Sequence, residues 1–180
     1  MDFLFVGGAA WLDFVNTEKI SHGARVDLLS TPEDLAEWAK AANLTSDRHV
    51  PLLHAKKFRA ELRGLAEALS NGRNAPVASL QAINAELRKH SGYFEVVLSD
   101  GSYGKRFVES GNALLGQLAE SAAQTLCEGN PSFVRRCDNP NCILYFYDTT
   151  KNHGRRFCSP AVCGNRMKVA AHYRRKREGS

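Results

Sequence analysis

Residues 158–166 read CSPAVCGNR and residues 137–142 read CDNPNC. These stretches hold four of the five cysteines, as two pairs with four residues inside each pair and fifteen between the pairs. Pairs at this separation can converge on one ion, and four tetrahedral thiolates suit zinc. Disulfides, redox-active thiols, an iron–sulfur cluster and unrelated buried cysteines are the alternatives. Since four thiolates leave no open position for water, we expect one structural Zn²⁺. Its ligands would be Cys137, Cys142, Cys158 and Cys163.

The sequence around these cysteines predicts a knuckle, a hairpin and a helix. A tight turn fits inside the first pair, and residues 143–157 can fold as a hairpin that turns at TTKNHG. Ser159 and Pro160 are typical of a capping residue and a first-turn proline. A helix should therefore begin there, carry Cys163 in its first turn and end near Arg177. This arrangement is a treble clef, and so short a segment needs its metal to fold.

The first 130 residues have the periodicity of a mainly helical domain. Apolar residues recur at helical spacing in residues 31–43, about 46–70, 76–89 and 113–127. Residues 8–16 fit either a short helix or a strand. The β-branched and aromatic residues of 93–110, which flank Asp100-Gly101, predict a β-hairpin.

The predicted fold class is therefore α+β, with two domains. A mainly helical domain with one hairpin, residues 1–130, precedes the zinc finger, residues 131–180, and the helix-breaking EGNPS segment separates them. In the helix at 76–89 we expect a buried stripe of Val77, Leu80, Ile83 and Leu87. We expect Cys127 to be a small buried residue.

The net charge of +5 is distributed unevenly. Residues 131–180 hold 11 Lys and Arg against 3 Asp and Glu, a net +8, whereas the other 130 residues hold 13 against 16, a net −3. After about −2 for zinc and four thiolates, the finger keeps roughly +6. Such a surface favours an anionic partner, and a helix of roughly 25 Å fits the major groove of DNA.

We expect DNA to be that partner, with RNA, an acidic protein or a merely solvated face as alternatives. The candidate DNA-binding residues are Arg155, Arg156, Arg166, Lys168, His172, Arg174, Arg175, Lys176 and Arg177. Arg166 and part of residues 174–177 could instead balance the thiolates or the end of the helix. On the opposite side, Met167 and Ala170 should face the zinc core together with Cys163.

The N-terminus favours a cytoplasmic protein. It is apolar but has no basic start, and Asp13 interrupts it too soon for a signal peptide or a membrane helix. We therefore expect no membrane association, and a reducing compartment in which disulfides are disfavoured.

Two motifs resemble a known bacterial family. RRFCSPAVCGNRMKV resembles the CGNR zinc finger, named for residues 163–166, and WLDFVNT at 11–17 resembles the start of the ABATE domain that precedes this finger. The resemblance covers nearly the whole chain. It implies a stress-induced transcription regulator with a helical ligand-binding domain and a treble clef that binds DNA. It also implies that the four paired cysteines bind zinc and that the basic residues around CGNR contact DNA. Phe157 stands where many relatives have Trp, an exchange that should leave the finger intact.

The implied ligand is an unknown small molecule, for which Trp11, Asp13, Asn16 and Thr17 are the candidate binding residues. These residues combine polar groups with apolar neighbours, as small-molecule sites do. Arg25 and Asp27 could close the same site. The alternative is that the polar side chains cap a helix and satisfy loop backbone groups.

We expect no enzymatic activity, since no nucleophile–base pair, phosphate loop or open metal site is evident. The alternative is an enzyme that uses Asp13 on a small substrate. His22, His54 and His90 lie at no catalytic or metal spacing, and we expect them at the surface or at helix ends. A homodimer is compatible with DNA binding, because many regulators bind paired half-sites.

Overall fold

The computed structural model describes residues 3–45, 50–90, 92–109 and 113–178. Over these residues the protein is α+β, as the sequence predicts. Its helices are α1 (Ala10–Val15), α2 (Pro32–Ala41), α3 (Leu52–Ser70), α4 (Val77–Lys89), α5 (Ala113–Cys127) and α6 (Asn165–Glu178). Its strands are β1 (Glu18–Ser21), β2 (Ala24–Asp27), β3 (Gly92–Ser99), β4 (Ser102–Glu109), β5 (Val134–Arg136) and β6 (Tyr145–Tyr147).

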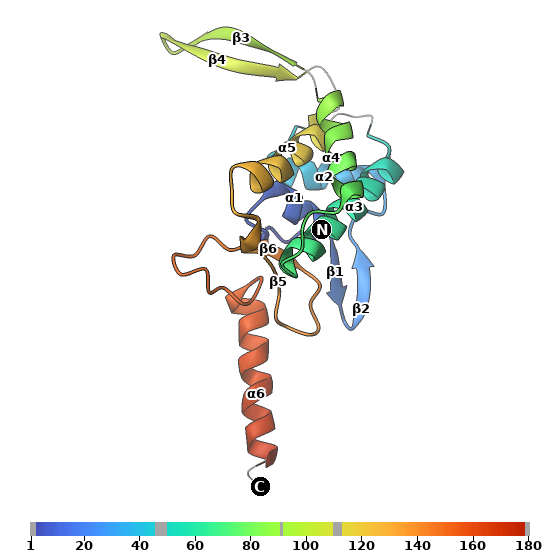
Figure 1. Ribbon diagram of the computed structural model, residues 1–180, viewed down its shortest axis with the longest axis vertical. Helices are drawn as coiled ribbons and strands as arrows, with labels where there is room; N and C mark the ends of the chain where they lie inside the picture. The colour runs from blue at the N-terminus through green and yellow to red at the C-terminus, as the bar shows by residue number, and fades with distance from the viewer. Residues whose placement is uncertain (1–2, 46–49, 91, 110–112, 179–180) are drawn as a thin grey trace.

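The hydrophobic core is centred on α1, so residues 8–16 form a helix and not a strand. This helix contacts α3, α5 and β6, and Figure 1 shows it in the middle of the helical body. Trp11, Leu12, Phe14 and Val15 are fully buried. A helix this short is marginal by itself, and burial on several sides stabilises it.

The start of α2 is fixed by a capping box. The backbone N–H of Asp34 donates to Thr31 Oγ1 at 3.2 Å, and the Asp34 carboxylate accepts from the Thr31 N–H at 2.8 Å. This reciprocal capping box satisfies two N–H groups that the helix itself leaves without partners. Trp38 then packs on Phe14 with ring centroids 5.0 Å apart.

Two helices differ from the prediction in detail. The predicted start of the second helix, near residue 46, lies outside the described residues, and α3 begins at Leu52, directly after Pro51. The stripe expected for α4 is wrong in part. Val77 is 70% exposed, whereas Ser79, Ile83 and Glu86 are buried. The Ser79 hydroxyl donates to the Glu61 carbonyl at 2.9 Å, so a polar contact with α3 sets the orientation of this helix.

The described residues of the N-terminal part form two antiparallel hairpins, one more than expected. The predicted hairpin is β3–β4, which turns at Asp100 and Gly101 with φ of 51° and 77°. Both values lie in the left-handed region that a two-residue type I′ turn requires. The second hairpin, β1–β2, turns at His22 and Gly23. Its strands of four residues are too short to give a clear alternating pattern.

The hairpin predicted for residues 143–157 is wrong in its pairing. β6 pairs with β5, which lies before the first cysteine pair, so the knuckle connects the two strands. Beyond β6 the buried Asp148 organises a loop, because its carboxylate accepts from the N–H groups of Thr150 and Arg155 at 3.0 and 2.9 Å. These bonds take the place of a second strand.

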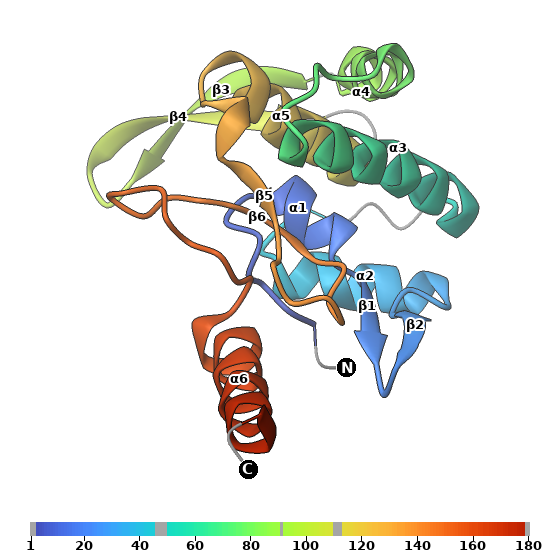
Figure 2. The ribbon, with the colours of Figure 1, turned by 60° about the horizontal axis from the view of Figure 1, so that its bottom comes forward.

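Figures 1 and 2 show β3–β4 and α6 leaving the helical body at opposite ends. β5 and β6 lie beside α1 in both views, and Val134 and Tyr145 belong to the same buried core as the helices. The boundary near residue 130 therefore stays a prediction about the organisation of the chain. Among the described helices, none is both long and apolar enough to cross a membrane.

Candidate metal centre and nucleic-acid interface

The four paired cysteines converge on one point. All four are buried, and their sulfur atoms lie within 4.8 Å of one another. The Cys142–Cys158 and Cys158–Cys163 sulfur distances are 3.8 and 3.6 Å. Tetrahedral zinc with bonds of about 2.3 Å places its sulfurs roughly 3.8 Å apart. These distances are far beyond a disulfide bond, and the thiolates of an iron–sulfur cluster, which bind different iron atoms, would lie farther apart. The site fits one structural zinc ion.

Backbone and amide donors surround the thiolates. The Cys158 N–H donates to Cys137 Sγ at 3.4 Å, and the buried Asn139 donates its Nδ2 to Cys163 Sγ at 3.5 Å. Asn139 also shapes the knuckle, because its Oδ1 accepts from the Asn141 N–H at 3.0 Å. Donors that contact the metal ligands without binding the metal themselves orient these ligands and stabilise their charge. An Asn between paired cysteines was the available sequence signal for this role.

The electrostatics of the cluster favour a dication. Hydrogen bonds with Cys142 and Cys158 lower the pKa of Cys137, whereas hydrogen bonds with Cys137 and Cys142, together with burial, raise the pKa of Cys158. Four neighbouring thiols therefore oppose full ionisation of one another. A divalent ion removes this conflict, and four thiolates with Zn²⁺ carry about −2 together.

The last ligand lies in the first turn of the C-terminal helix, as predicted. Ser159 Oγ accepts from the Val162 N–H at 3.3 Å and caps a π-helical turn, Pro160–Gly164, which continues into α6. Cys163 and Gly164 are buried in this turn. The zinc centre thereby holds the start of α6 and sets the direction in which the helix leaves the body.

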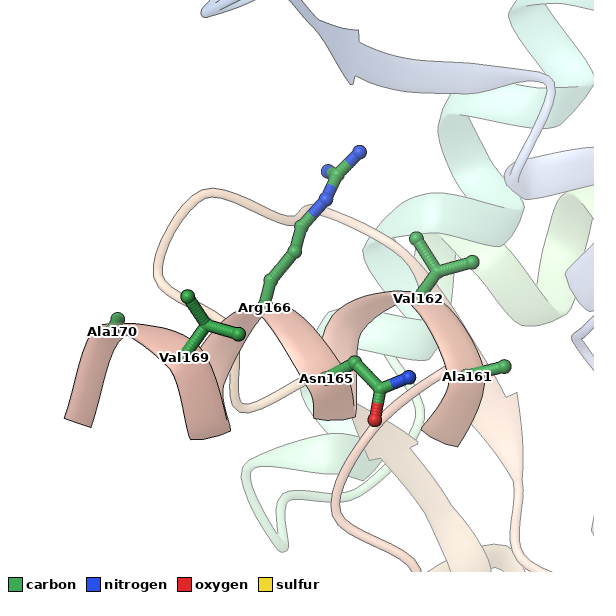
Figure 3. Close-up of a pocket in the computed structure, with 6 residues that line it drawn as sticks. All are labelled: Ala161, Val162, Asn165, Arg166, Val169 and Ala170. Atoms are coloured by element: carbon green, nitrogen blue, oxygen red, sulfur yellow. The ribbon is translucent and has the colours of Figure 1, made fainter. Parts of the chain in front are cut away.

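Beyond its first turn α6 packs against no described part of the chain. Met167 is half-buried, Ala170 is exposed, and every residue from Lys168 to Arg177 is exposed. The prediction that Ala170 faces the zinc core is therefore wrong, because the helix extends away from that core (Figure 1). Arg166 projects away from the helix axis beside Val162 and Asn165 (Figure 3).

The structure keeps most predicted basic residues on the surface. Among described residues, no carboxylate forms an ion pair with Arg166, Lys168, Arg174, Arg175 or Arg177. His172 lies exposed beside Tyr173 with ring centroids 5.8 Å apart, and Lys176 is exposed near the end of the helix. Arg156 is exposed as well and pairs with Asp138 at 2.7 Å.

Arg155 does not belong to that exposed surface, contrary to the prediction. Its guanidinium is stacked 4.3 Å from the Phe146 ring centroid and donates to the carbonyls of Val6, Phe157 and Cys158, with distances of 2.9 and 3.0 Å to the first two. It is half-buried. Arg155 therefore fastens the finger to the N-terminal segment and is not available to a phosphate.

The four predicted ligand-binding residues serve the fold. Trp11 Nε1 donates to Thr125 Oγ1 at 2.9 Å, and the Thr17 hydroxyl donates to the Phe14 carbonyl at 2.7 Å. The Asn16 amide donates to the Tyr145 carbonyl at 2.8 Å and accepts from the Tyr145 N–H at 2.9 Å. These three residues are almost fully buried. Their polar groups are satisfied within the chain, which leaves none for a ligand.

Asp13 has a structural partner too. Its carboxylate accepts from the Gly7 N–H at 2.7 Å, and burial raises its pKa to about 6 against the lowering effect of this bond and of Arg155. Gly7 leaves no room for a side chain, since a Cβ there would lie 2.8 Å from the backbone nitrogen of Asp13. The carboxylate thus holds the N-terminal segment close to α1.

A charged network beneath β1–β2 was missed from the sequence. The buried Arg59 binds both oxygens of Asp27, at 2.8 and 2.7 Å, and the Thr17 hydroxyl at 2.7 Å. Arg63 pairs with Glu18 at 2.9 Å and donates to the carbonyls of Val15 and Ile143. Partial burial raises the pKa of the Asp27 carboxyl. The hydrogen bonds to this group, with that from Arg59 foremost, outweigh burial and lower the pKa. Two arginines one turn apart in α3, with Arg59 next to the apolar Phe58, were the available signal.

Arg25 and Asp27, which could have closed a ligand site, lie in this network instead. Arg25 pairs with Glu18 at 2.6 Å. His22 is exposed in the turn of β1–β2, and His54 pairs with the buried Glu86 at 2.9 Å. His90 follows the last residue of α4, and its side chain is 10% exposed. Cys127 is exposed, so the prediction that it is buried is wrong.

A cavity of about 650 Å³ lies between the N-terminal part and the finger. The N-terminal segment, the β1–β2 turn and the zinc module each contribute to its wall. Three zinc ligands, Cys142, Cys158 and Cys163, belong to this wall. The apolar lining also includes Leu4, Val6, Ile20, Leu144 and Val162, and the polar lining includes Lys19, Ser21, His22, Asn141, Ser159 and Arg166. None of the predicted ligand-binding residues reaches it.

Comparison with known families agrees with these observations. A family model described as "Putative stress-induced transcription regulator", ABATE, matches residues 8–129, and the CGNR zinc finger model matches residues 134–176. No curated protein matches the chain. The first match spans more than half of the sequence and the second contains all four clustered cysteines. The chain therefore belongs to the ABATE family and carries a C-terminal CGNR zinc finger.

Proposed function

We propose that this protein is a transcription regulator that binds DNA through α6 and senses a small molecule through its N-terminal domain. The exposure of α6 carries the proposal. The zinc centre holds its first turn while residues 168–177 are exposed on all sides. Fourteen residues give a helix of about 21 Å, a suitable length for the major groove. The protein would act as a binding protein, without enzymatic turnover.

Phosphate contacts are the form of binding that the charges favour. The cations on this helix are Arg166, Lys168, Arg174, Arg175, Lys176 and Arg177. If about four to six of them contact phosphates, log K should fall with log salt with a slope between about −4 and −5. Four of these cations are consecutive and repel one another, so a polyanion would also stabilise the end of the helix.

The test is a titration of zinc-loaded protein with labelled duplex DNA at several salt concentrations. The variant Arg174→Ala/Arg175→Ala/Lys176→Ala/Arg177→Ala removes four cations from α6. The control Lys40→Ala/Lys57→Ala/Arg73→Ala/Arg88→Ala removes four exposed cations elsewhere. We expect the slope of log K against log salt to be smaller in magnitude by about 2 to 4 in the first variant than in the wild type. The control should keep the wild-type slope. Equal effects in both would show that binding follows net charge and not α6.

RNA and acidic polymers in the same assay address the alternative partners. A regulator that docks α6 in the major groove should prefer duplex DNA, because the major groove of A-form RNA is too narrow to admit a helix. Preference for RNA, or equal binding to poly-glutamate, would favour a zinc-stabilised RNA- or protein-interaction module.

The cavity between β1–β2 and the finger supports the sensing part of the proposal. Its volume lies in the range of small-molecule sites, and such sites are common where domains meet. Among described residues its lining combines an apolar wall with Lys19, His22 and Arg166, and it also includes the zinc ligands Cys142, Cys158 and Cys163. This chemistry fits an amphipathic anion whose acidic group would lie near the three basic residues and away from the thiolates.

Arg166 provides a route from this cavity to DNA. It lines the cavity and also belongs to the first α-helical turn of α6. An anion that pairs with Arg166 would withdraw one cation from the DNA surface and would contact both β1–β2 and the finger. Ligand binding should therefore lower DNA affinity, and DNA should lower ligand affinity by the same factor.

A further inference from the structure

The β3–β4 hairpin carries a row of large, exposed apolar side chains on one of its faces. Its register places Phe94, Val96 and Leu98 on one side of the hairpin, with Lys105 opposite Val96 and Tyr103 opposite Leu98. The other side carries the Glu95–Arg106 ion pair. We call the surface of Phe94, Val96, Leu98 and Tyr103 the apolar hairpin face. Their exposed fractions are 60%, 76%, 65% and 81%.

The opposite side is mixed, because Tyr93, Val97 and Val108 accompany the ion pair there. A lone two-stranded hairpin is marginal in water, so exposed apolar side chains on it favour a partner. β3 and β4 make their main contacts with each other, and the hairpin extends away from the helices in Figure 1. The apolar hairpin face is therefore a contiguous exposed patch of the kind that marks an interaction site.

We propose that this face packs against the same face of a second copy of the chain, forming a two-fold dimer. The size of the patch agrees with this. Two aromatic and two aliphatic side chains, each 60–81% exposed, leave roughly 500 Å² open per chain. Two such faces bury roughly 1,000 Å² together, near the lower limit for a specific interface.

The charges agree with self-association. Lys105 is a described charged residue on this side of the hairpin, and its ammonium lies 3.9 Å from the Phe94 ring centroid. Its stem can therefore add to the apolar surface, and in a dimer the ammonium would leave the Phe94 ring and turn outward at the edge of β4. The ion-paired Glu95 and Arg106 lie on the opposite side, outside the contact. Two copies would thus meet without a buried like-charge pair at the centre of the interface.

The position of the hairpin agrees as well. In Figure 1 it lies across one end of the molecule, whereas α6 runs along the long axis at the other end. A two-fold axis through the paired hairpins and along that direction would leave both α6 helices exposed at the same end of the dimer. A dimer of this kind could offer two basic helices to paired half-sites.

The experiment uses the zinc-loaded full chain, without DNA, in sedimentation velocity at tens of micromolar. Val96→Glu places a charge in the apolar hairpin face. Val97→Glu introduces the same change one residue later, on the side of Glu95 and Arg106. We expect a wild-type dimer, a Val97→Glu dimer, and a dissociation constant raised about tenfold or more in Val96→Glu, because the new carboxylate would be buried without a partner.

Three results would overturn the proposal. A monomeric wild type at these concentrations would assign the face to another protein. A dimer unaffected by Val96→Glu would place the interface elsewhere, and equal loss in both variants would show an effect on the hairpin rather than on one face. If Val96→Glu fails to fold, Leu98→Lys tests the same face with the opposite charge. Because self-association is measured without DNA, this inference can fail while DNA binding holds, and the reverse.

Discussion

The side chain of Asn16 satisfies both backbone hydrogen-bonding groups of Tyr145, at 2.8 and 2.9 Å. Asn16 follows α1 in the ABATE part of the chain, and Tyr145 begins β6 in the finger. Each residue is at least 95% buried. The amide acts as one rung of a β-ladder between two segments that are 129 residues apart. This pair joins the helical body to the zinc module.

Asn16→Ala should destabilise the whole chain. It leaves the N–H and C=O of a buried residue without partners, at a cost of about 1–3 kcal/mol for each unsatisfied group. Asn84→Ala is a suitable control, because Asn84 is exposed in α4 and Ala favours a helix. Urea unfolding of both variants measures the difference. Equal stabilities would show that the Asn16–Tyr145 bonds are not important for holding the two parts together.

Cys163→Ser should remove zinc from the protein. A hydroxyl is a poor zinc ligand, and three thiolates without the fourth leave the start of α6 unsupported. We expect sub-stoichiometric zinc by metal analysis and a loss of helical circular dichroism that corresponds to α6, with the core of α1–α5 still folded. Cys127→Ser, the exposed cysteine outside the cluster, should keep one zinc per chain. Normal zinc content in Cys163→Ser would refute the assigned ligand set.

Two helical glycines should respond to alanine in opposite ways. Gly64 lies in α3, and a Cβ there would have Ser79 Oγ at 3.8 Å, so Gly64→Ala should stabilise by about 0.5–1 kcal/mol. Gly116 in α5 faces His90, and a Cβ there would lie 2.5 Å from the His90 Cβ. Gly116→Ala should therefore destabilise by about 1–3 kcal/mol through overpacking. Thermal unfolding of the pair measures both signs, and a stabilising Gly116→Ala would mean that α4 and α5 do not pack this closely.

Asp13 should make stability depend on pH. Its pKa rises from 3.8 to about 6 in the folded chain because it is buried. The folded state then binds more protons than the unfolded state between these values, so this contribution to stability is complete below about pH 4 and is lost as the pH rises through about 6. Asp13→Asn keeps an acceptor for the Gly7 N–H without the charge. Its gain over the wild type should grow from pH 4 to 7 and reach about 2–3 kcal/mol. A gain independent of pH would show that Asp13 does not titrate in this range.

Octanoate is a simple probe for the cavity, and octanol is its uncharged control. We expect octanoate to raise the melting temperature and to weaken DNA binding, and octanol to do neither at the same concentration, because only the anion can pair with Lys19 and Arg166. Ile20→Trp should fill the cavity and abolish both effects. Stabilisation by octanoate that persists in Ile20→Trp would place its site elsewhere on the protein.

Local patterns were sufficient for most elements of the fold. The Thr31 capping box, the Asp100-Gly101 turn and the Ser159-Pro160 start of the last helix each rest on neighbouring residues. Their energies depend on a few adjacent side chains, so a single sequence contains the information. The zinc site belongs to this group too, because the spacing of two cysteine pairs limits where they can meet.

Contacts between distant residues were not predictable in this way. The orientation of α4 depends on the Ser79 contact with α3, and the partner of β6 is a strand on the other side of the knuckle. In the candidate site, Arg155 looked like a surface cation but finds three carbonyls and the Phe146 ring. Whether a polar group is buried depends on which partners the complete fold brings to it. A single segment is compatible with several different partners, so its own sequence does not identify them.

The sequence by itself determined the zinc ligands, the helical character of both parts and the concentration of positive charge at the C-terminal end. Only the tertiary structure decided that α6 is exposed along its length, that Trp11, Asp13, Asn16 and Thr17 hold the fold together, and that a cavity lies between β1–β2 and the finger. The first group follows from the chemistry and spacing of residues close along the chain. The second depends on packing, because which side chains face solvent, one another or a cavity is set when segments more than one hundred residues apart come together.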